Sequence, residues 1–178
     1  MRKPAEFVVE SERLAVRPWR DGDRPALERM VADSDMMRYL THGRAWPASD
    51  VDEFLARQAR QLGEHGVCMG PLERRGADGV VGVAGIQPLD LPGEYELGWW
   101  VWKDHWGLGY APEIARALVG FATEVMALRR VCAVIDVDNR ASRRVAEKLG
   151  MRYERTVPAR ETAARRPEDP VAIYSLEW

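Results

Sequence analysis

Residues 104–122 read DHWGLGYAPEIARALVGFA and place two glycines, Gly107 and Gly109, directly ahead of a regular helical pattern. Glycine adopts positive φ readily and leaves the neighbouring backbone amides uncovered by a Cβ atom. The first amides of a helix have no helical partners and carry partial positive charge, so they bind anions. The stretch therefore predicts a phosphate-binding loop at a helix start, although a glycine pair also occurs in ordinary strand-to-helix turns.

Two other phosphate-binding motifs do not fit this stretch. Pro112 stands where a dinucleotide-binding fingerprint needs its third glycine. The glycine-rich loop of nucleoside triphosphate-binding proteins, GxxxxGKS or GxxxxGKT, does not occur in the sequence. Nicotinamide cofactors and nucleoside triphosphates are therefore not favoured as ligands.

Hydrophobic periodicity predicts the elements around the loop. One face of a long helix collects the apolar residues Ala111, Ile114, Ala115, Leu118, Val119, Ala122, Val125 and Met126. The stretch EYELGWWVW, residues 94–102, alternates in the manner of a strand. Further strands are expected at 14–16, 67–75, 80–89, 130–137, 151–157 and 171–178, and further helices at 23–31, 49–66 and 139–150.

Local signals refine some of these boundaries. Ser49 and Asp52 form a capping-box pattern ahead of the second helix. Pro71 indicates an edge position or a bulge in its strand. The order β-α-α-β-β-β-α-β-α-β-β predicts an α/β (α+β) fold, with a mixed, mostly antiparallel twisted sheet flanked by helices. The length of 178 residues suits a single domain over 1–178.

Composition excludes several classes of function. The net charge of −2 gives no reason to expect a nucleic acid or an acidic membrane as partner. No apolar run is long enough to cross a bilayer and no signal-peptide pattern is present, so a cytoplasmic protein is expected. Cys68 and Cys132 lie in apolar runs, which predicts buried thiols, and the three histidines are scattered, so no metal site is expected.

Three stretches together resemble the GNAT superfamily of N-acetyltransferases: residues 96–122, residues 137–156 (VDNRASRRVAEKLGMRYERT) and residues 11–23 (SERLAVRPWRDGD). They resemble most closely the branch of the Rim-type ribosomal-protein N-terminal acetyltransferases. The resemblance covers about residues 11–157 and implies the acyl-CoA N-acyltransferase fold. It also implies transfer of acetyl from acetyl-CoA to a primary amine, by direct attack in a ternary complex without a covalent enzyme intermediate.

The resemblance assigns residues to the binding of CoA. The family's pyrophosphate loop falls on Trp106, Gly107, Leu108, Gly109, Tyr110 and Ala111. Trp106 replaces the usual Arg or Gln and Leu108 a common Lys, so Lys103 or Arg143 is expected to supply the cation. In the family, the preceding strand splays at a bulge and pairs with pantetheine. Here that implies contacts from Trp100, Val101, Trp102 and Asn139, with Gly98 as the place of the distortion.

The chemistry needs a base for the amine and an acid for the departing thiolate. Glu96 is the first candidate for the base, acting through water, and Glu94 the second; either could instead be a solvated carboxylate. The family's tyrosine acid is replaced by Ala146. The resemblance then implies Ser142, with a water molecule as the other donor, although a serine in the first turn of a helix can also serve only the backbone.

The sequence does not identify the amine that accepts the acetyl group. The branch favours a protein N-terminus, with a polyamine, an aminoglycoside or another small amine as alternatives. Residues expected on the acceptor side are Asp33, Asp35, Tyr39 and Trp46, and residues 155–170 read as a solvated loop or a flap over the substrate. The protein is expected to be a monomer or a homodimer. The rival interpretation is a non-catalytic acyl-CoA-binding or sensing module.

Overall fold

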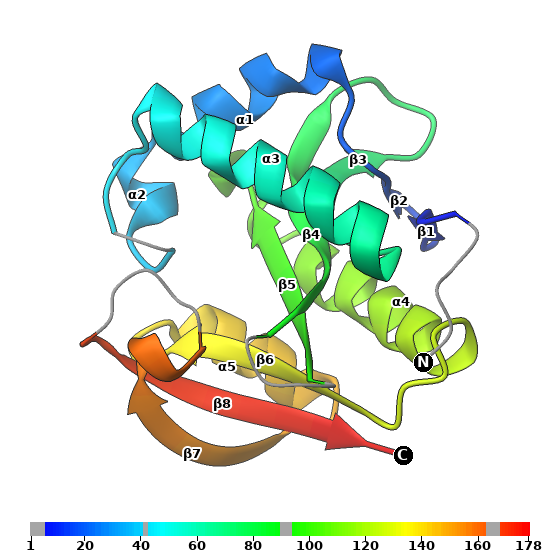
Figure 1. The fold of residues 1–178 in the computed structure, drawn as a ribbon, viewed down its shortest axis with the longest axis vertical. Helices are drawn as coiled ribbons and strands as arrows, with labels where there is room; N and C mark the ends of the chain where they lie inside the picture. The colour runs from blue at the N-terminus through cyan, green and yellow to red at the C-terminus, as the bar shows by residue number, and fades with distance from the viewer. Residues whose placement is uncertain (1–5, 41–42, 90–93, 163–167) are drawn as a thin grey trace.

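The computed structural model describes residues 6–40, 43–89, 94–162 and 168–178. They form one eight-stranded sheet in the order β1-β2-β3-β4-β5-β6-β8-β7 (Figure 1). The strands are β1 (Val9–Glu10), β2 (Leu14–Val16), β3 (Met69–Arg74), β4 (Val80–Pro88), β5 (Tyr95–Val101), β6 (Arg130–Asp136), β7 (Arg152–Pro158) and β8 (Pro170–Glu177). The helices are η1 (Asp21–Asp23), α1 (Arg24–Val31), α2 (Ser34–Met37), α3 (Ala48–His65), η2 (Lys103–His105), α4 (Tyr110–Glu124), α5 (Arg140–Lys148) and η3 (Ala159–Thr162).

The sheet is antiparallel except at one pair of strands. β1 to β5 form antiparallel neighbours, as do β6, β8 and β7. β5 and β6 run parallel and pair only at Glu96 and Cys132. The prediction of a mixed, mostly antiparallel sheet is confirmed, and the parallel pair divides it into two antiparallel halves.

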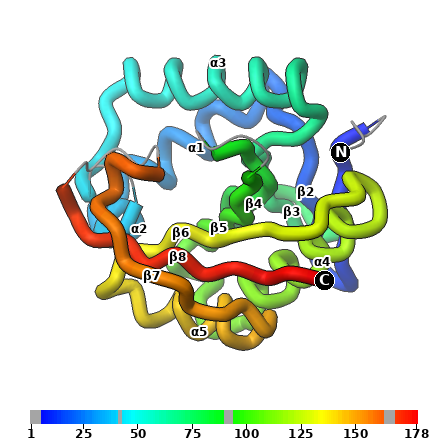
Figure 2. The backbone as a smooth tube through the Cα atoms, turned by 60° about the horizontal axis from the view of Figure 1, so that its bottom comes forward, coloured from blue at the N-terminus to red at the C-terminus, as the bar shows by residue number. Residues whose placement is uncertain are grey.

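Helices cover both faces of the sheet, with α1 and α3 on one side and α4 and α5 on the other (Figure 2). The alternation of β5 explains the division, because the buried side chains of Tyr95, Leu97, Trp99 and Val101 belong to the core beneath α4. Trp100, from the opposite face, packs against the second core cluster, which includes Phe54 of α3. A strand with one apolar layer on each side is thereby fixed in register.

The predictions from the sequence did not include β1, α2 or the three short helices η1, η2 and η3, and they misplaced one helix start. β1 has two residues and α2 has four, too few for a hydrophobic period to show. α3 begins at Ala48 behind an extended Pro47, so the capping box predicted at Ser49 and Asp52 is wrong. Proline at that boundary cannot donate a backbone hydrogen bond and carries the chain into the helix without a side-chain cap.

Two other local expectations have clear outcomes. β3 has a register irregularity between Leu72 and Glu73, next to Pro71, and its pairing with β2 ends at Leu72. Pro71 therefore lies beside a bulge and beyond the end of one neighbouring strand, as predicted. Val125 was expected on the buried face of the long helix, but it lies beyond the last helical residue and is exposed.

An ion-pair network ties the first strands to the first helices. Arg17, which follows β2, places Nη1 and Nη2 at 2.7 and 2.9 Å from the two carboxylate oxygens of Asp23. Its Nη2 also lies 2.5 Å from Oε1 of Glu73 on β3. The Asp23 carboxylate accepts the backbone N–H of Arg20 as well, at 2.8 Å. These hydrogen bonds, with that from Arg17 the largest contribution, hold the pKa of Asp23 below its usual range.

We predict that Asp23→Asn lowers the free energy of unfolding at pH 7 by about 1–3 kcal/mol, because it breaks a largely buried charged pair. The depressed pKa of the folded carboxylate means that its stabilisation is present above the unfolded value of about 3.9 and is lost as pH falls through the folded value. The difference from wild type should therefore shrink below about pH 4. Urea unfolding at pH 7 and pH 3 measures it, with the exposed Asp21→Asn as control. An equal difference at both pH values would contradict the prediction.

Candidate functional site

The parallel strands β5 and β6 diverge beyond their single paired position, and the site lies where they separate. The backbone N–H of Trp102 donates to the carbonyl of Val81 on β4 at 2.8 Å. Because successive residues of a strand direct their backbone groups to opposite sides, those of Trp99 and Val101 point away from β4, toward the opening. The opening holds a small cavity of about 60 Å³, lined by Glu96, Ser142 and Asn139 among others.

Gly98 does not distort the strand as expected. The register of β4 and β5 is continuous from Val101 to Tyr95, and Gly98 simply faces Gly85. A Cβ atom at Gly98 would lie 2.4 Å from Cε of Met69, so glycine leaves room for the Met69 side chain there. The strands β5 and β6 pair at a single position although the pairing of β5 with β4 has no bulge.

The glycine loop has the backbone that its sequence predicts. Gly107 and Gly109 both have φ of +78°, a conformation that other residues rarely adopt. Gly109 is the residue before α4 and offers no side-chain cap to the first amides of the helix. Nothing lies within 4 Å of the position that a Cβ of Gly107 would take. The loop therefore presents uncovered amides beside open space, as a phosphate group requires.

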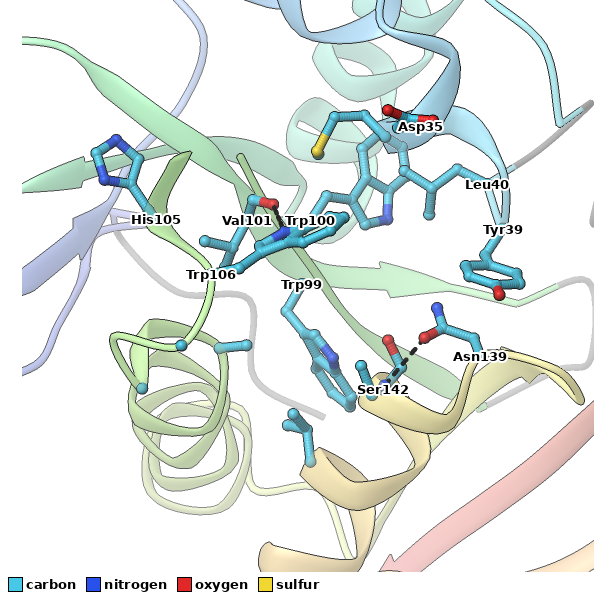
Figure 3. Close-up of a pocket in the computed structure, with 16 residues that line it drawn as sticks. Asp35, Tyr39, Leu40, Trp99, Trp100, Val101, His105, Trp106, Asn139 and Ser142 are labelled. Atoms are coloured by element: carbon cyan, nitrogen blue, oxygen red, sulfur yellow. Dashed lines mark hydrogen bonds between the residues drawn. The ribbon is translucent and has the colours of Figure 1, made fainter. Parts of the chain in front are cut away.

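A pocket of about 380 Å³ connects this loop with the opening between the strands (Figure 3). From the predicted CoA-binding set, the structure brings together Trp100, Val101, Trp106, Gly107, Gly109, Ala111, Asn139 and Ser142 along its wall. Three members of the set are not in that lining. Leu108 is about half exposed, the Tyr110 side chain is buried in the core beneath the loop, and Trp102 packs toward the α3 side.

Trp106 has a contact that the sequence did not indicate. Its side chain is 58% exposed, and its indole Nε1–H donates to the carbonyl of Val101 at 2.7 Å. Figure 3 shows this bond as a dashed line between two residues that line the pocket. Because the Val101 carbonyl points into the opening, the indole occupies an acceptor on the strand edge that a bound ligand would otherwise reach.

The two expected cations are engaged elsewhere. Lys103 Nζ lies 2.5 Å from Oδ2 of Asp33, the residue that caps α2. The same ammonium lies 3.9 Å from the exposed carboxylate of Asp35. Arg143 donates through Nε to the Tyr174 hydroxyl at 3.0 Å and through Nη1 to the Val137 carbonyl at 3.2 Å. Lys103 thus joins η2 to α2, and Arg143 joins α5 to the strands behind it.

Glu96 and Glu94 have different surroundings. Glu96 accepts a hydrogen bond from Gln87 Nε2 at 2.8 Å and another from the backbone of Val134. Part of the residue reaches the surface, but its carboxyl group is desolvated, and this burial raises the pKa of Glu96. Glu94 instead forms an ion pair with Arg130 and is absent from the lining of both cavities. Of the two candidates, Glu96 is therefore the one that the structure brings to the opening, where Asp136 also lines the small cavity.

Asn139 and Ser142 start α5 at the opposite side of the opening. The Asn139 side chain accepts the backbone N–H of Ser142 at 3.1 Å, so it caps the helix. Both residues line both cavities, together with Tyr39 (Figure 3). Ala146, one turn further along α5, is fully buried and offers no proton donor.

The acceptor-side residues divide in two. Asp35 and Tyr39 line the larger pocket, as do the apolar side chains of Met36 and Leu40. Trp46 does not, because it is buried against Phe54 and Trp100 in the core. Of the expected loop or flap at 155–170, the first residues belong to β7 and η3, and residues 163–167 lie outside the described residues.

Several other kinds of site find no support in the described ranges. Cys68 and Cys132 are free and buried, and burial raises the pKa of the Cys68 thiol to about 12. Neither is an available nucleophile at neutral pH. Among the residues that the structure describes, no group of three or more His, Cys, Asp or Glu side chains could hold a metal ion. None of the described helices has the length and apolar character needed to span a membrane.

Comparison with known proteins supplies the family. The profile described as "Acetyltransferase (GNAT) domain" matches residues 13–152, most of the chain. The chain belongs to the GNAT acetyltransferase family. The matched residues include β5, the glycine loop, α4 and α5, so they contain every element that lines the pocket.

Individual relatives agree with this assignment. YkkB of Bacillus subtilis (strain 168), described as an uncharacterized protein, is 29% identical over 96% of this chain and 95% of its own. YnaD of the same organism, described as an uncharacterized N-acetyltransferase, is 27% identical over 82% of this chain and 83% of its own.

Solved structures show the same fold. A GNAT-family acetyltransferase from Bacillus anthracis has a TM-score of 0.79 and 26% identity, covering 96% of this chain and 98% of that one. RimL, a ribosomal L7/L12 α-N-protein acetyltransferase in complex with coenzyme A, has a TM-score of 0.78 at 18% identity, again covering 96% and 98%. The GNAT acetyltransferase fold predicted from the sequence is confirmed.

The indole of Trp106 gives a prediction about CoA binding. Trp106→Phe keeps an aromatic ring but removes the N–H that occupies the Val101 carbonyl. If the pantetheine arm pairs with this strand edge, as the family resemblance implies, CoA should bind about two- to tenfold more tightly to the variant, because no protein hydrogen bond has to be displaced. Calorimetric titration with CoA measures the change. Weaker binding to the variant would mean that the indole N–H helps to hold CoA instead.

Proposed function

We propose that this acetyltransferase transfers the acetyl group of acetyl-CoA to a primary amine by direct attack in a ternary complex. One observation carries the proposal: the pocket runs from the uncovered amides of the glycine loop to an opening lined by a desolvated carboxylate, Glu96, and a hydroxyl, Ser142. A relative described as an N-acetyltransferase supports nitrogen as the acceptor atom. Residues 1–178 would work as one domain.

The residues present fit CoA. Amides at a helix N-terminus suit a pyrophosphate, and the positive φ of Gly107 and Gly109 leaves them open. On β5, Val101 and Trp99 have backbone groups directed to the opening, whereas those of Trp102 serve β4. We therefore assign the pantetheine contacts to Val101, Trp99 and Asn139. The backbone groups of Trp100 and Trp102, which were expected to contact pantetheine, are not assigned to it. An N–H of the free strand edge also suits the oxyanion formed during transfer.

Glu96 is the proposed base. When bound, acetyl-CoA supplies an activated thioester, whose carbonyl carbon forms the new bond to the amine nitrogen as the carbon–sulfur bond breaks. Glu96 accepts the proton that the nitrogen loses, directly or through water. The raised pKa of this carboxylate makes it a stronger base than a solvated glutamate. Ser142 donates a proton to the departing thiolate and regains one from water.

The surroundings favour a peptide N-terminus over a polycationic amine as acceptor. The larger pocket carries Met36, Tyr39 and Leu40 on this side, and Asp35 is its only carboxylate among the described lining residues. The small cavity adds Glu96, the proposed base, and Asp136. The nearby Asp33 is already paired with Lys103. A polyamine or an aminoglycoside would need several unpaired carboxylates, whereas a single α-amino group needs one base.

The direct test is a panel of acceptors incubated with acetyl-CoA: a peptide with a free α-amino group, a polyamine and an aminoglycoside. Release of CoA thiol in step with acetylation of one acceptor, seen by mass spectrometry, supports the transferase. The replacement of the family's tyrosine by Ala146 and the indole bond to Val101 favour a second candidate, a non-catalytic acyl-CoA sensor. Selective binding of acetyl-CoA with no acetylated amine would support the sensor.

We predict that Glu96→Gln lowers kcat by at least about a hundredfold, because the amide cannot accept the proton. In wild type, kcat should rise with pH through the raised pKa of Glu96, since the ionised form is the base. The variant should lack that acid limb. Glu94→Gln is the matched control and should keep it. A pH profile that is the same in wild type and Glu96→Gln would exclude Glu96 as the base.

We also predict that Ser142→Ala lowers kcat about 10- to 100-fold with little change in the KM for acetyl-CoA, because a hydrogen bond to the developing thiolate is lost. Ser142→Thr keeps a hydroxyl and serves as the control that retains most of the activity. An unchanged kcat in Ser142→Ala would assign the proton transfer to water.

A further inference from the structure

We infer that Arg13 is a positioning residue for the CoA pyrophosphate, because its guanidinium fixes a carbonyl of the glycine loop and neutralises Glu113 at the start of α4. Arg13 lies in the turn before β2, far in sequence from the loop. The inference rests on the proposed function, since it assumes that the glycine loop binds CoA. It assigns a role that the family's loop motif does not include.

The Arg13 side chain contacts several residues of the glycine loop and the first turn of α4. Nη2 donates to the Leu108 carbonyl at 3.0 Å, and Nε donates to Oε2 of Glu113 at 2.7 Å. The guanidinium carbon lies 4.9 Å from the centroid of the Tyr110 ring, which is buried beneath the loop. Nη2 lies 3.6 Å from the position that a Cβ of Gly109 would occupy. One side chain thus touches or faces four residues of the loop and the first turn of α4.

The bond to Leu108 sets the direction of a loop amide. In a trans peptide, the carbonyl of one residue and the N–H of the next point in opposite directions. No peptide bond among the described residues is cis. Because Arg13 holds the Leu108 carbonyl on its own side, the Gly109 N–H points away from Arg13. Gly109 lines the large pocket, so this bond fixes a donor in the loop that receives the phosphates.

The negative charge of Glu113 needs to be offset by a cation if a phosphate is to bind at the start of α4. It lies in the first turn of α4, where a carboxylate would repel a bound phosphate. Burial raises its pKa, but hydrogen bonds from the Ser11 hydroxyl at 2.7 Å and the Arg13 backbone at 2.8 Å, with the Arg13 guanidinium, outweigh this and lower the pKa of Glu113. Glu113 is therefore ionised at neutral pH, and Arg13, with Nη2 at 2.6 Å from Oε2, offsets its charge.

The other cations considered for this role do not reach the loop. Lys103 is paired with Asp33, and Arg143 binds Tyr174 and Val137. Trp106 and Leu108, within the loop itself, carry no charge. Arg13 is about half exposed and is not among the described residues that line the large pocket, so it acts through the loop and through Glu113 rather than by contact with a phosphate.

Calorimetric titration with CoA, which needs no acceptor and no turnover, tests the inference. Arg13→Ala should weaken CoA binding about 10- to 100-fold, because it loses charge-assisted hydrogen bonds and leaves Glu113 unneutralised. Arg13→Lys keeps the charge, but an ammonium group cannot bond both Leu108 and Glu113 as a planar guanidinium does. The affinity of Arg13→Lys for CoA should therefore lie between those of wild type and Arg13→Ala. Glu113→Gln added to Arg13→Ala should recover part of the loss, because the repelling carboxylate is gone.

Arg75→Ala is the matched control. Arg75 has a similarly exposed side chain and donates to the Ser11 carbonyl at 2.8 Å, in the same turn as Arg13, but no contact with the loop is present among its described bonds. It should bind CoA like wild type. Thermal unfolding of each variant separates a loss of affinity from a loss of folded protein.

The results of these titrations distinguish a failure of the role inferred for Arg13 from a failure of the proposed function. If wild type does not bind CoA, the proposed function fails. If wild type binds and folded Arg13→Ala binds within twofold of it, the inference alone is overturned. It is also overturned if Glu113→Gln recovers none of the affinity that Arg13→Ala loses, because the neutralising role would then be absent.

Discussion

β5 and β6 pair only between Glu96 and Cys132, and the arrangement of the site depends on that single parallel contact. Had the two strands stayed paired, Trp99 and Val101 would bond to β6 and no ligand could approach their backbone. Because they diverge, one strand edge is left open in the middle of a large sheet, and α4 and α5 start on the two sides of it. Glu96 and Ser142 both line the small cavity in this gap.

The segments that surround this opening are held by contacts between distant parts of the chain. Lys103 ties the turn after β5 to the cap of α2, and Arg13 ties the turn before β2 to the start of α4. Both ion pairs are partly exposed, so each contributes little to global stability. Their effect is local: they fix the two borders of the pocket relative to the sheet, where small displacements would alter the fit of a ligand.

Sequence patterns predicted the parts of the molecule that depend on local physics. The face of α4, the hairpins and the conformation of Gly107 and Gly109 follow from periodicity and from the steric freedom of glycine. β1 and α2 were missed because they are too short to show a period. The pairing of Arg13 with Glu113 spans 100 residues, and no local signal marks it. Trp46 was expected on the acceptor side from the resemblance of its region to relatives, but Phe54 and Trp100 bury it, and no local pattern marks these contacts.

The bond between Trp106 and Val101 also bears on the fate of the protein without its ligand. An unpaired strand edge is a template on which another chain can add a strand, and natural sheets protect such edges. Here the open edge of β5 lies in the interior of the sheet order, between β4 and β6. The indole covers one of its acceptors with a bulky side chain. Trp106 thus leaves one fewer free acceptor on the edge where another strand could add.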